Sequence, residues 1–251
     1  MKNFNQRNIL SNHICLLLFS HHQAKEFRLN QGYQHTDDYK KCHLAVCDTR
    51  RSLGRLQQYL LNAFLHADIP VVGISPFNFL VSKQFELTND DYQSLFKHVE
   101  HVLQQGFVPL LHGDVILDKK VHWRVLSGDD LLLKLTEYFH PRQCLFFTSV
   151  PGVMRSDGSI IEEFILDENQ FHSIEESHSS TTIDVTGSMQ NKVSIASEIV
   201  RQFDEQCQVL ILQGVSENAK QILSSSLSIN DKQIFDVHGC TRIFKRKNKI
   251  D

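Results

Sequence analysis

The sequence lacks any apolar run near the ~18 residues that a membrane-spanning helix needs. Its longest early run, residues 14–19, is also too short for a secretory signal, and no small-residue cleavage site follows it. An excess of one charge is missing too, since 26 Lys and Arg oppose 29 Asp and Glu. A net charge of −3 disfavours bulk binding to nucleic acid or to an acidic membrane. We therefore expect neither partner.

The sequence also lacks the spacings that mark metal and redox sites. None of the six cysteines forms a C-x-x-C pair, and the fourteen histidines contain no H-E-x-x-H string. At 251 residues, the chain is too large for a scaffold held by disulfides. We interpret the cysteines as free thiols of a reducing compartment, which predicts a cytoplasmic location. We expect no metal-ligating protein residues.

Short apolar runs alternate along the chain with amphipathic helical stretches. This alternation predicts an α/β fold, an open αβα sandwich with a mostly parallel central sheet covered on both faces. The predicted strands are 14–19, 70–74, 107–111, 144–148 and 209–213, and the predicted helices are 44–66, 90–106, 129–138, 191–203 and a short one after 214. Strands 115–117 and 121–126 are predicted to form a hairpin.

No internal repeat and no long linker interrupts this pattern, so we expect one domain with two lobes over residues 1–251. In parallel sheets, ligands bind beyond the carboxyl ends of the strands. The chemistry is therefore expected just after residues 19, 111, 148 and 213. The basic run at 242–249 is interpreted as a solvated tail.

The strongest local feature is the string DVTGSMQNK at 184–192, in which a polar loop leads through Gly187 into a helix carrying Lys192. Exposed backbone N–H groups at the start of a helix favour a phosphate, and a lysine adds a point charge for a phosphoryl group in transfer. The alternative is an ordinary helix start with a solvated lysine.

Two glycine turns also follow predicted strands, in LHGDV at 111–115 and SGDD at 127–130. Either turn lets backbone amides approach an anion, although both also read as plain turns with N-capping aspartates. His21 and His22 follow the first strand and could donate to a phosphate, or could be exposed loop residues. TSVPGV at 148–153 could wrap a nucleotide or be a simple turn.

Taken in order, these segments resemble the isopentenyl phosphate kinases of the amino acid kinase superfamily. The matching strings are HHQAKEF at 21–27, GDVILD at 113–118, VLSGDD at 125–130 and DVTGSMQNK at 184–192. The resemblance covers nearly the whole chain. It implies an open αβα sandwich and transfer of the γ-phosphate of ATP, with Mg²⁺, to isopentenyl phosphate. Dimers are common in this family, so the resemblance also allows a homodimer.

The resemblance implies roles for residues on the acceptor side. His21 matches a histidine that hydrogen-bonds the acceptor phosphate. Gly113 and Gly128 match glycines around the acceptor site, and Asp129 matches an aspartate that positions catalytic lysines. His21, Asp129 and Lys192 are thus the expected catalytic residues.

On the nucleotide side, the resemblance implies that the loop after the strand at 144–148 contacts ATP. Gly187 and Lys192 match the glycine and lysine that hold the ATP phosphates. The loop residues implied in ATP binding are Thr148, Ser149, Gly152 and Val153. ATP and Mg²⁺ are the expected cofactors, and a small molecule is the expected partner.

The sequence departs from the family at several motifs. The family's opening K-x-G-G-S string, which lies under the ATP phosphates, has no counterpart, and residues 1–13 contain no glycine. Leu17 and Ser20 stand where the family string G-S-F-G-H has glycines, and Ser188 replaces the second glycine of D-V-T-G-G-M. We therefore expect the first strand and the glycine loop to be missing, through a splice or gene-model artefact or a decayed copy.

Two further hypotheses follow. The first is a catalytically impaired, kinase-like protein that acts as a binding module. The second is an acetylglutamate-type or uridylate-type kinase of the same superfamily. His21, just after the first strand, favours a phosphate acceptor of the isoprenoid kind over this last alternative.

Overall fold

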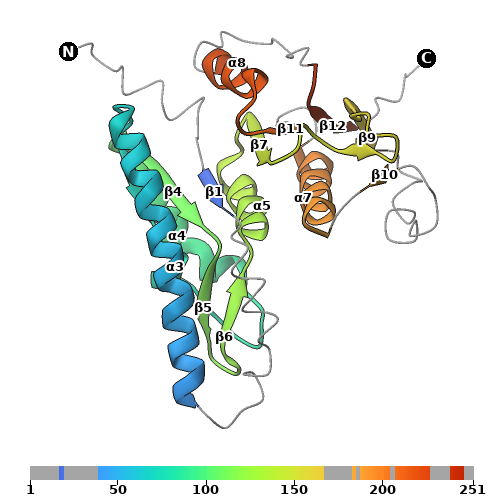
Figure 1. Ribbon diagram of the computed structural model, residues 1–251. Coiled ribbons are helices and arrows are strands. Elements are labelled where there is room, and N and C mark those ends of the chain that lie inside the picture. Colours follow the sequence, from blue (N-terminus) through green and yellow to red (C-terminus); the bar gives the residue numbers. More distant parts are fainter. Residues whose placement is uncertain are drawn as a thin grey trace. The chain divides into compact units, whose positions relative to one another are not determined.

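A computed structural model describes residues 17–19, 39–166, 183–184, 187–203, 207–226 and 238–245. The chain divides into two compact units, Met1–Tyr138 and Phe139–Asp251 (Figure 1). Two predicted features, His21 and the polar loop at 177–182, lie outside the described residues. Each unit is described by itself below.

The helices of the first unit follow from their apolar periodicity. Helix α3 spans Tyr39–His66 and begins five residues before the prediction. It packs along strands β2 (Val71–Gly73) and β5 (Asp114–Asp118). Helix α4 spans Asn89–Gln104 and buries its predicted stripe, which includes Leu95 and Val99. The carboxylate of Asp91 accepts hydrogen bonds from the backbone N–H and hydroxyl of Thr88, at 2.7 and 2.8 Å, which closes the start of α4.

The strands of the first unit form two small sheets. One is parallel, in the order β1–β4–β2, with β1 at Leu17–Phe19 and β4 at Val108–His112. The other has the order β3–β5–β6, where β3 is Val81–Ser82 and β6 is His122–Leu126. The predicted hairpin is confirmed as β5 and β6, which pair antiparallel from Asp114–Leu126 to Asp118–His122. The short helix η2 (Pro76–Asn78) lies against β5, and α5 (Gly128–Phe139) follows β6.

The second unit holds a four-stranded sheet in the order β7–β11–β12–β9. Strands β7 (Gln143–Thr148) and β11 (Gln208–Gln213) are parallel, as predicted. The side chains of Leu210 and Leu212 cluster with Ala219 of α8 (Glu217–Ser226), while α7 (Gly187–Phe203) also packs on β11. Because neighbouring strand residues point to opposite faces, this central strand is buried on both faces.

One sequence prediction fails in this sheet. Residues Thr241–Lys245, which include part of the run interpreted as a solvated tail, form strand β12 between β11 and β9 (Glu163–Leu166). Thr241 and Ile243 are buried on one face of β12, whereas Arg242 lies on the other face with Phe244, and Lys245 ends the strand at a partly exposed position. Basic residues at partly exposed positions of a strand look like a tail when only charge is counted.

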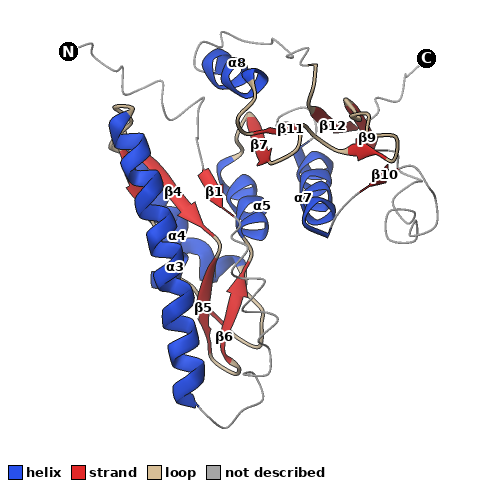
Figure 2. Cartoon of the chain, viewed as in Figure 1, coloured by secondary structure: helices blue, strands red, loops and turns tan. Residues whose placement is uncertain are grey.

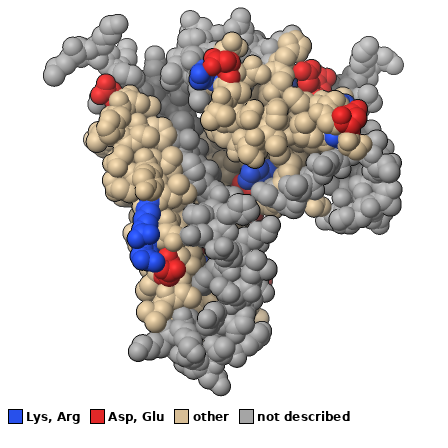
Figure 3. Space-filling model, in the orientation of Figure 1, with Lys and Arg blue, Asp and Glu red and all other residues tan. Residues whose placement is uncertain are grey.

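The α/β class is confirmed (Figure 2). Among the described strands, five pairs are parallel and three are antiparallel. No helix of this described part combines the length and apolar character needed to cross a membrane. On the face seen in Figure 3, the described Lys and Arg side chains lie beside Asp or Glu side chains and do not gather into one basic field.

Candidate functional site

Two glycine turns of the first unit, predicted separately from sequence, lie against each other. Gly113 connects β4 to β5, and Gly128 begins α5. A Cβ atom on Gly113 would lie 2.7 Å from the backbone nitrogen of Gly128 and 2.8 Å from the carbonyl oxygen of Leu126. Both neighbouring atoms belong to the backbone, which cannot move aside as the end of a flexible side chain could. Only glycine therefore fits at residue 113.

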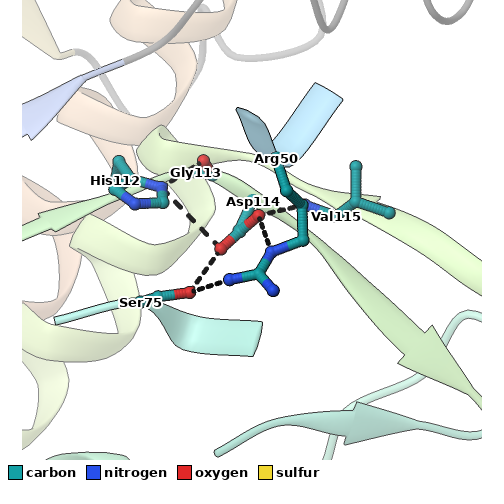
Figure 4. Close-up of polar contacts among 6 residues, drawn as sticks. All are labelled: Arg50, Ser75, His112, Gly113, Asp114 and Val115. Carbon is teal, nitrogen blue, oxygen red and sulfur yellow. Dashed lines mark hydrogen bonds and ion pairs between the residues drawn. The ribbon is translucent and has the colours of Figure 1, made fainter. Parts of the chain in front are cut away.

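A buried carboxylate follows directly on this turn (Figure 4). The Asp114 side chain has no exposed surface, and its Oδ2 accepts a hydrogen bond of 2.7 Å from the hydroxyl of Ser75. Its Oδ1 accepts the backbone N–H of Val115 at 2.8 Å and lies 3.5 Å from Nε of Arg50. The guanidinium of Arg50 also donates to the Ser75 hydroxyl at 3.0 Å, so these three side chains form a closed ring of contacts.

His112 completes this cluster on the other side of Gly113. Its Nδ1 lies 2.8 Å from the carbonyl oxygen of Gly113 and 3.9 Å from Oδ2 of Asp114. The short contact to a carbonyl identifies Nδ1 as the donor. His112 also pairs in register with Phe19, the last residue of β1, so β4 and β1 end side by side. His21, which follows two residues later, is outside the described part of the chain.

The first turn of α5 contains the predicted positioning residue Asp129. The hydroxyl of Ser127 accepts the backbone N–H of Asp129 at 3.2 Å, and the Ser127 carbonyl accepts the N–H of Leu131 at 3.1 Å. Ser127 therefore caps the helix. The Asp129 side chain is partly buried in the first turn, beside the exposed Asp130. The structure thus brings Gly113, Gly128 and Asp129 together in one unit.

In the second unit, Thr241 of β12 contacts the predicted nucleotide loop at 148–153. A Cβ atom on Gly152 would lie 2.5 Å from Oγ1 and 2.9 Å from the backbone nitrogen of Thr241. The same hydroxyl accepts the backbone N–H of Val153 at 2.7 Å, and the Val153 carbonyl accepts the N–H of Ile161 at 2.8 Å. Val153 is also fully buried. Its contacts suit an anchor of the loop better than a direct ligand of a nucleotide.

The start of this loop is tied to the end of β11. The Thr148 hydroxyl donates to the carbonyl of Val150 at 2.6 Å, and the Thr148 carbonyl accepts the N–H of Gly214 at 3.1 Å. The side-chain amide of Gln213 donates to the carbonyl of Ser149 at 3.1 Å. Ser149 itself is exposed, and its side chain therefore faces outward at the carboxyl end of a parallel strand pair.

A short antiparallel ladder joins the loop to the predicted phosphate-binding helix. Strand β8 (Met154–Arg155) pairs with β10 (Ile183–Asp184), with Met154 opposite Asp184. Gly187, the first residue of α7, follows Asp184 by three positions, and Lys192 lies partly buried in the second turn of that helix. The two segments predicted to bind ATP are therefore neighbours within the second unit.

No group of three or more His, Cys, Asp or Glu side chains within the described ranges is placed to hold a metal ion. Mg²⁺ in nucleotide sites is bound largely by substrate phosphates and water, with one or two carboxylates at most. The described residues do not form a metal cage, so we assign no protein ligand to Mg²⁺.

The sequence alone does not reveal the partners that hold the Gly113 turn and the loop at 148–153. Arg50 lies within the helix predicted over 44–66, and Ser75 directly follows the strand predicted over 70–74. Asp114 was noted as a carboxylate in a turn, without a partner, because 39 residues separate it from Ser75. A serine after a strand and an arginine on a helix are common, so nothing local marks Ser75 and Arg50 as partners of Asp114. Thr241 directly precedes the basic run at 242–249, and no local pattern predicts its contact with the loop at 148–153.

Comparisons with known proteins agree with this fold. The amino acid kinase family matches residues 18–212. An isopentenyl phosphate kinase of Arabidopsis thaliana is 27% identical over 202 residues, which cover 73% of this chain and 58% of that protein. The isopentenyl phosphate kinase of Methanocaldococcus jannaschii is 29% identical over 182 residues, which cover 70% of this chain and 64% of that protein. The chain thus spans about three fifths of these relatives.

Solved structures show the same fold. An X-ray structure of isopentenyl phosphate kinase matches with a TM-score of 0.64 at 17% identity, covering 95% of this chain and 87% of that chain. Carbamate kinase from Giardia lamblia bound to AMP-PNP matches with a TM-score of 0.55 at 13% identity, covering 93% and 84%. The family match covers more than half of the sequence and agrees with both structures, and the chain belongs to the amino acid kinase family.

Proposed function

We propose that this protein transfers the terminal phosphate of ATP to isopentenyl phosphate and forms isopentenyl diphosphate and ADP. The observation that carries the proposal is the close contact of Gly113 with Gly128 at the start of α5, on a chain whose relatives in a plant and an archaeon are isopentenyl phosphate kinases. Glycine at both positions puts no side chain over the backbone of these turns, which suits the close approach of a phosphate to the start of a helix.

We assign the acceptor to residues of the first unit. His21 would donate a hydrogen bond to the acceptor phosphate, and the Gly113 and Gly128 turns would border it. Asp129, in the first turn of α5, would orient cationic groups around it. The position of Phe19 beside His112 supports this assignment, because the carboxyl ends of β1 and β4 lie side by side.

We assign ATP to residues of the second unit. Thr148, Ser149 and Gly152 would border the nucleotide, with Val153 as the buried anchor of their loop. Gly187 and Lys192 would meet its phosphates. The ladder between β8 and β10 supports this grouping, because it pairs Met154, which follows the loop, with Asp184, the first residue of the DVTGSMQNK string. Mg²⁺, when bound to the ATP phosphates, would lower the repulsion between the two anions.

The reaction needs no covalent enzyme intermediate. An oxygen of the acceptor phosphate attacks the γ-phosphorus of ATP, a new P–O bond forms, and the bond to the β-phosphate oxygen breaks with its electron pair leaving on ADP. The protein's contribution is to hold two anions in line and neutralise their charge. Loss of one donor at such a site typically lowers the rate by ~10²–10³-fold.

The test is formation of ADP by the purified, folded protein in the presence of isopentenyl phosphate and MgATP, with isopentenyl diphosphate identified by ³¹P NMR. We expect Lys192→Ala and His21→Ala to lower kcat by ~10²-fold or more. N-acetylglutamate and uridylate serve as acceptor controls, and a clear preference for either would replace isopentenyl phosphate in the proposal. Absence of turnover with every acceptor would contradict it.

A second candidate is a kinase-like protein that binds these ligands without turnover. It is favoured by one observation, the presence of Leu17 and Ser20 where the family string G-S-F-G-H has glycines. Binding of ATP or isopentenyl phosphate in calorimetry, without ADP formation, would support it.

We also propose a homodimer in the cytoplasm as the working state. None of the four cysteines with described side chains forms a disulfide, which suits that compartment, and sedimentation would measure the assembly.

A further inference from the structure

The first unit contains a buried charge that the proposed reaction does not yet use. Asp114 follows the acceptor-side glycine directly, and its side chain is fully removed from solvent. Burial of a carboxylate is costly unless hydrogen bonds and a cation compensate for it. A buried ion pair seldom stabilises a fold more than apolar residues of the same shape would. Its presence is therefore better explained by the geometry that it imposes.

The contacts of Asp114 reach three separate segments of the unit. Arg50 comes from α3, Ser75 from the turn between β2 and η2, and Val115 from β5 itself. The Arg50 guanidinium is in turn fixed over the ring of Phe77, with its central carbon 3.8 Å from the ring centroid. The guanidinium thus contacts Ser75 and Asp114 (Figure 4) as well as the ring of Phe77, so the direction of the Asp114 carboxylate is set by rigid elements.

The carboxylate in turn restrains the residues on the amino-terminal side of β5. Oδ1 accepts the N–H of Val115, and Oδ2 faces Nδ1 of His112 at 3.9 Å while that nitrogen donates to the Gly113 carbonyl. The peptide groups on both sides of Asp114, the first of which carries the Gly113 carbonyl, are thus held in one orientation. That orientation matters because the Gly113 turn already lies against the Gly128 backbone nitrogen, where little displacement is possible.

We propose that Asp114, through its contacts with Arg50 and Ser75, is a positioning residue that fixes the Gly113 turn for the acceptor phosphate. The inference rests on the proposed function, because it assigns the Gly113 and Gly128 turns to the acceptor. Asp114 does not touch the substrate in this account. It acts through the backbone of Gly113 and the imidazole of His112.

Strand β5 supplies a matched control. Asp118 lies at its other end, is equally buried, and accepts hydrogen bonds from the Ser82 hydroxyl at 2.7 Å and from the backbone N–H groups of Phe85 and Lys120 at 2.9 and 2.7 Å. It is thus a buried carboxylate of the same strand, but its contacts hold the hairpin turn and a loop, and none of them is to the Gly113 turn.

The test compares Asp114→Asn with Asp118→Asn in the full chain. For Asp114→Asn we expect the KM for isopentenyl phosphate to rise ~10-fold and kcat/KM to fall by ~10²-fold, with the KM for ATP within twofold of wild type, because misplacement of a positioned group by about 1 Å has effects of this size. Asp118→Asn should leave both KM values unchanged. Arg50→Gln should raise the acceptor KM, and adding it to Asp114→Asn should have little further effect, because both changes break one contact.

Two additions keep the test decisive. If Asp114→Asn does not fold, Ser75→Ala removes one contact and leaves the carboxylate in place, and we expect a ~3-fold to 10-fold rise in the acceptor KM that Ser75→Thr reverses. Calorimetric titration with isopentenyl phosphate alone, in the absence of ATP, measures acceptor binding without turnover.

The outcomes separate the two proposals. Turnover by wild type with an unchanged acceptor KM in Asp114→Asn overturns this inference and leaves the proposed function standing. Binding of isopentenyl phosphate without turnover contradicts the proposed function. The role of Asp114 is then decided by the dissociation constants for isopentenyl phosphate: a higher value in Asp114→Asn than in wild type supports it, and equal values overturn it. If wild type neither binds nor turns over isopentenyl phosphate, both proposals are wrong.

Discussion

Strand β5 carries an aspartate at each end, and the two are satisfied in different ways. The Asp118 carboxylate accepts four backbone N–H groups, those of Gln84, Phe85, Lys120 and Val121, together with one hydroxyl. The Asp114 carboxylate instead faces mainly side chains, those of Arg50, Ser75 and His112. Backbone donors are fixed once the turn has formed, whereas side-chain donors connect separate segments. The difference indicates a folding role for one end and a positioning role for the other.

The largest expected effect comes from closing the space between the glycine turns. Gly113→Ala places a methyl group within 3 Å of two backbone atoms. We expect the free energy of unfolding to fall by about 3 kcal/mol, and acceptor-dependent turnover to fall by more than ~10²-fold. Urea denaturation and the ADP assay measure the two quantities. Unchanged stability would show that the turns can separate, which would remove the physical basis of the comparison.

Removing the charge of Asp118 tests the folding role. In Asp118→Asn, an amide NH₂ faces backbone donors, and at least one buried N–H loses its acceptor. We expect the free energy of unfolding to fall by about 2 kcal/mol in urea denaturation. The acceptor KM should not change. A raised KM in this variant would mean that both ends of β5 act on the site, and the contrast between them would be lost.

The pKa of the Asp118 carboxyl group determines one part of how the free energy of unfolding depends on pH. Burial alone would raise the pKa of Asp118, but hydrogen bonds from the N–H groups of Val121 and Phe85, the Ser82 hydroxyl and the Lys120 N–H together hold the pKa well below its usual value. A depressed pKa in the folded state stabilises the fold above the ordinary carboxyl pKa of about 4, and this contribution is lost as the pH falls toward the folded value.

We therefore expect the melting temperature to fall below about pH 4, and to fall less steeply in Asp118→Asn, which has no carboxylate to protonate. Thermal denaturation between neutral pH and pH 2 measures both proteins. Parallel curves for wild type and variant would contradict the assigned pKa direction.

The smallest expected effect calibrates the glycine comparison. Gly54 lies inside α3, and a Cβ atom there would meet no atom within 4 Å. Gly54→Ala should raise the free energy of unfolding by about 0.5–1 kcal/mol, because alanine favours the helix and nothing is displaced. The same urea denaturation applies. A loss of stability comparable to that of Gly113→Ala would show that steric contact is not what distinguishes the two sites.

Much of the fold could be predicted from local patterns. The β5–β6 hairpin, the α4 helix and the buried β11 strand all follow from periodicity within short windows, since each is defined by neighbours in sequence. Strand β12 could not be predicted in this way. Its burial depends on β11 and β9, which are far away in sequence, and its alternation was hidden by its basic residues.

The same distinction applies to the candidate site, where residues with a local signature could be predicted and contacts between distant segments could not. Gly113 and Gly128 could be singled out because turn glycines carry a local signature, and their mutual contact gives them one location. The Arg50–Ser75–Asp114 contacts could not, because each residue has an ordinary local role on a helix, a turn or a strand. Only the folded arrangement brings a charged group of α3 to the end of β4.

The placement of β12 also bears on how the protein is made. Strand β9 leaves the ribosome before β12, and in the described sheet β12 is its hydrogen-bonded neighbour. Until Thr241–Lys245 emerge, a nascent chain therefore leaves β9 without its described neighbour in the sheet and exposes one edge of β11. Unpaired edges of this kind promote association between chains. Translation that stalls before residue 241 should thus produce aggregation-prone fragments, and the described sheet of the second unit is complete only once β12 is inserted.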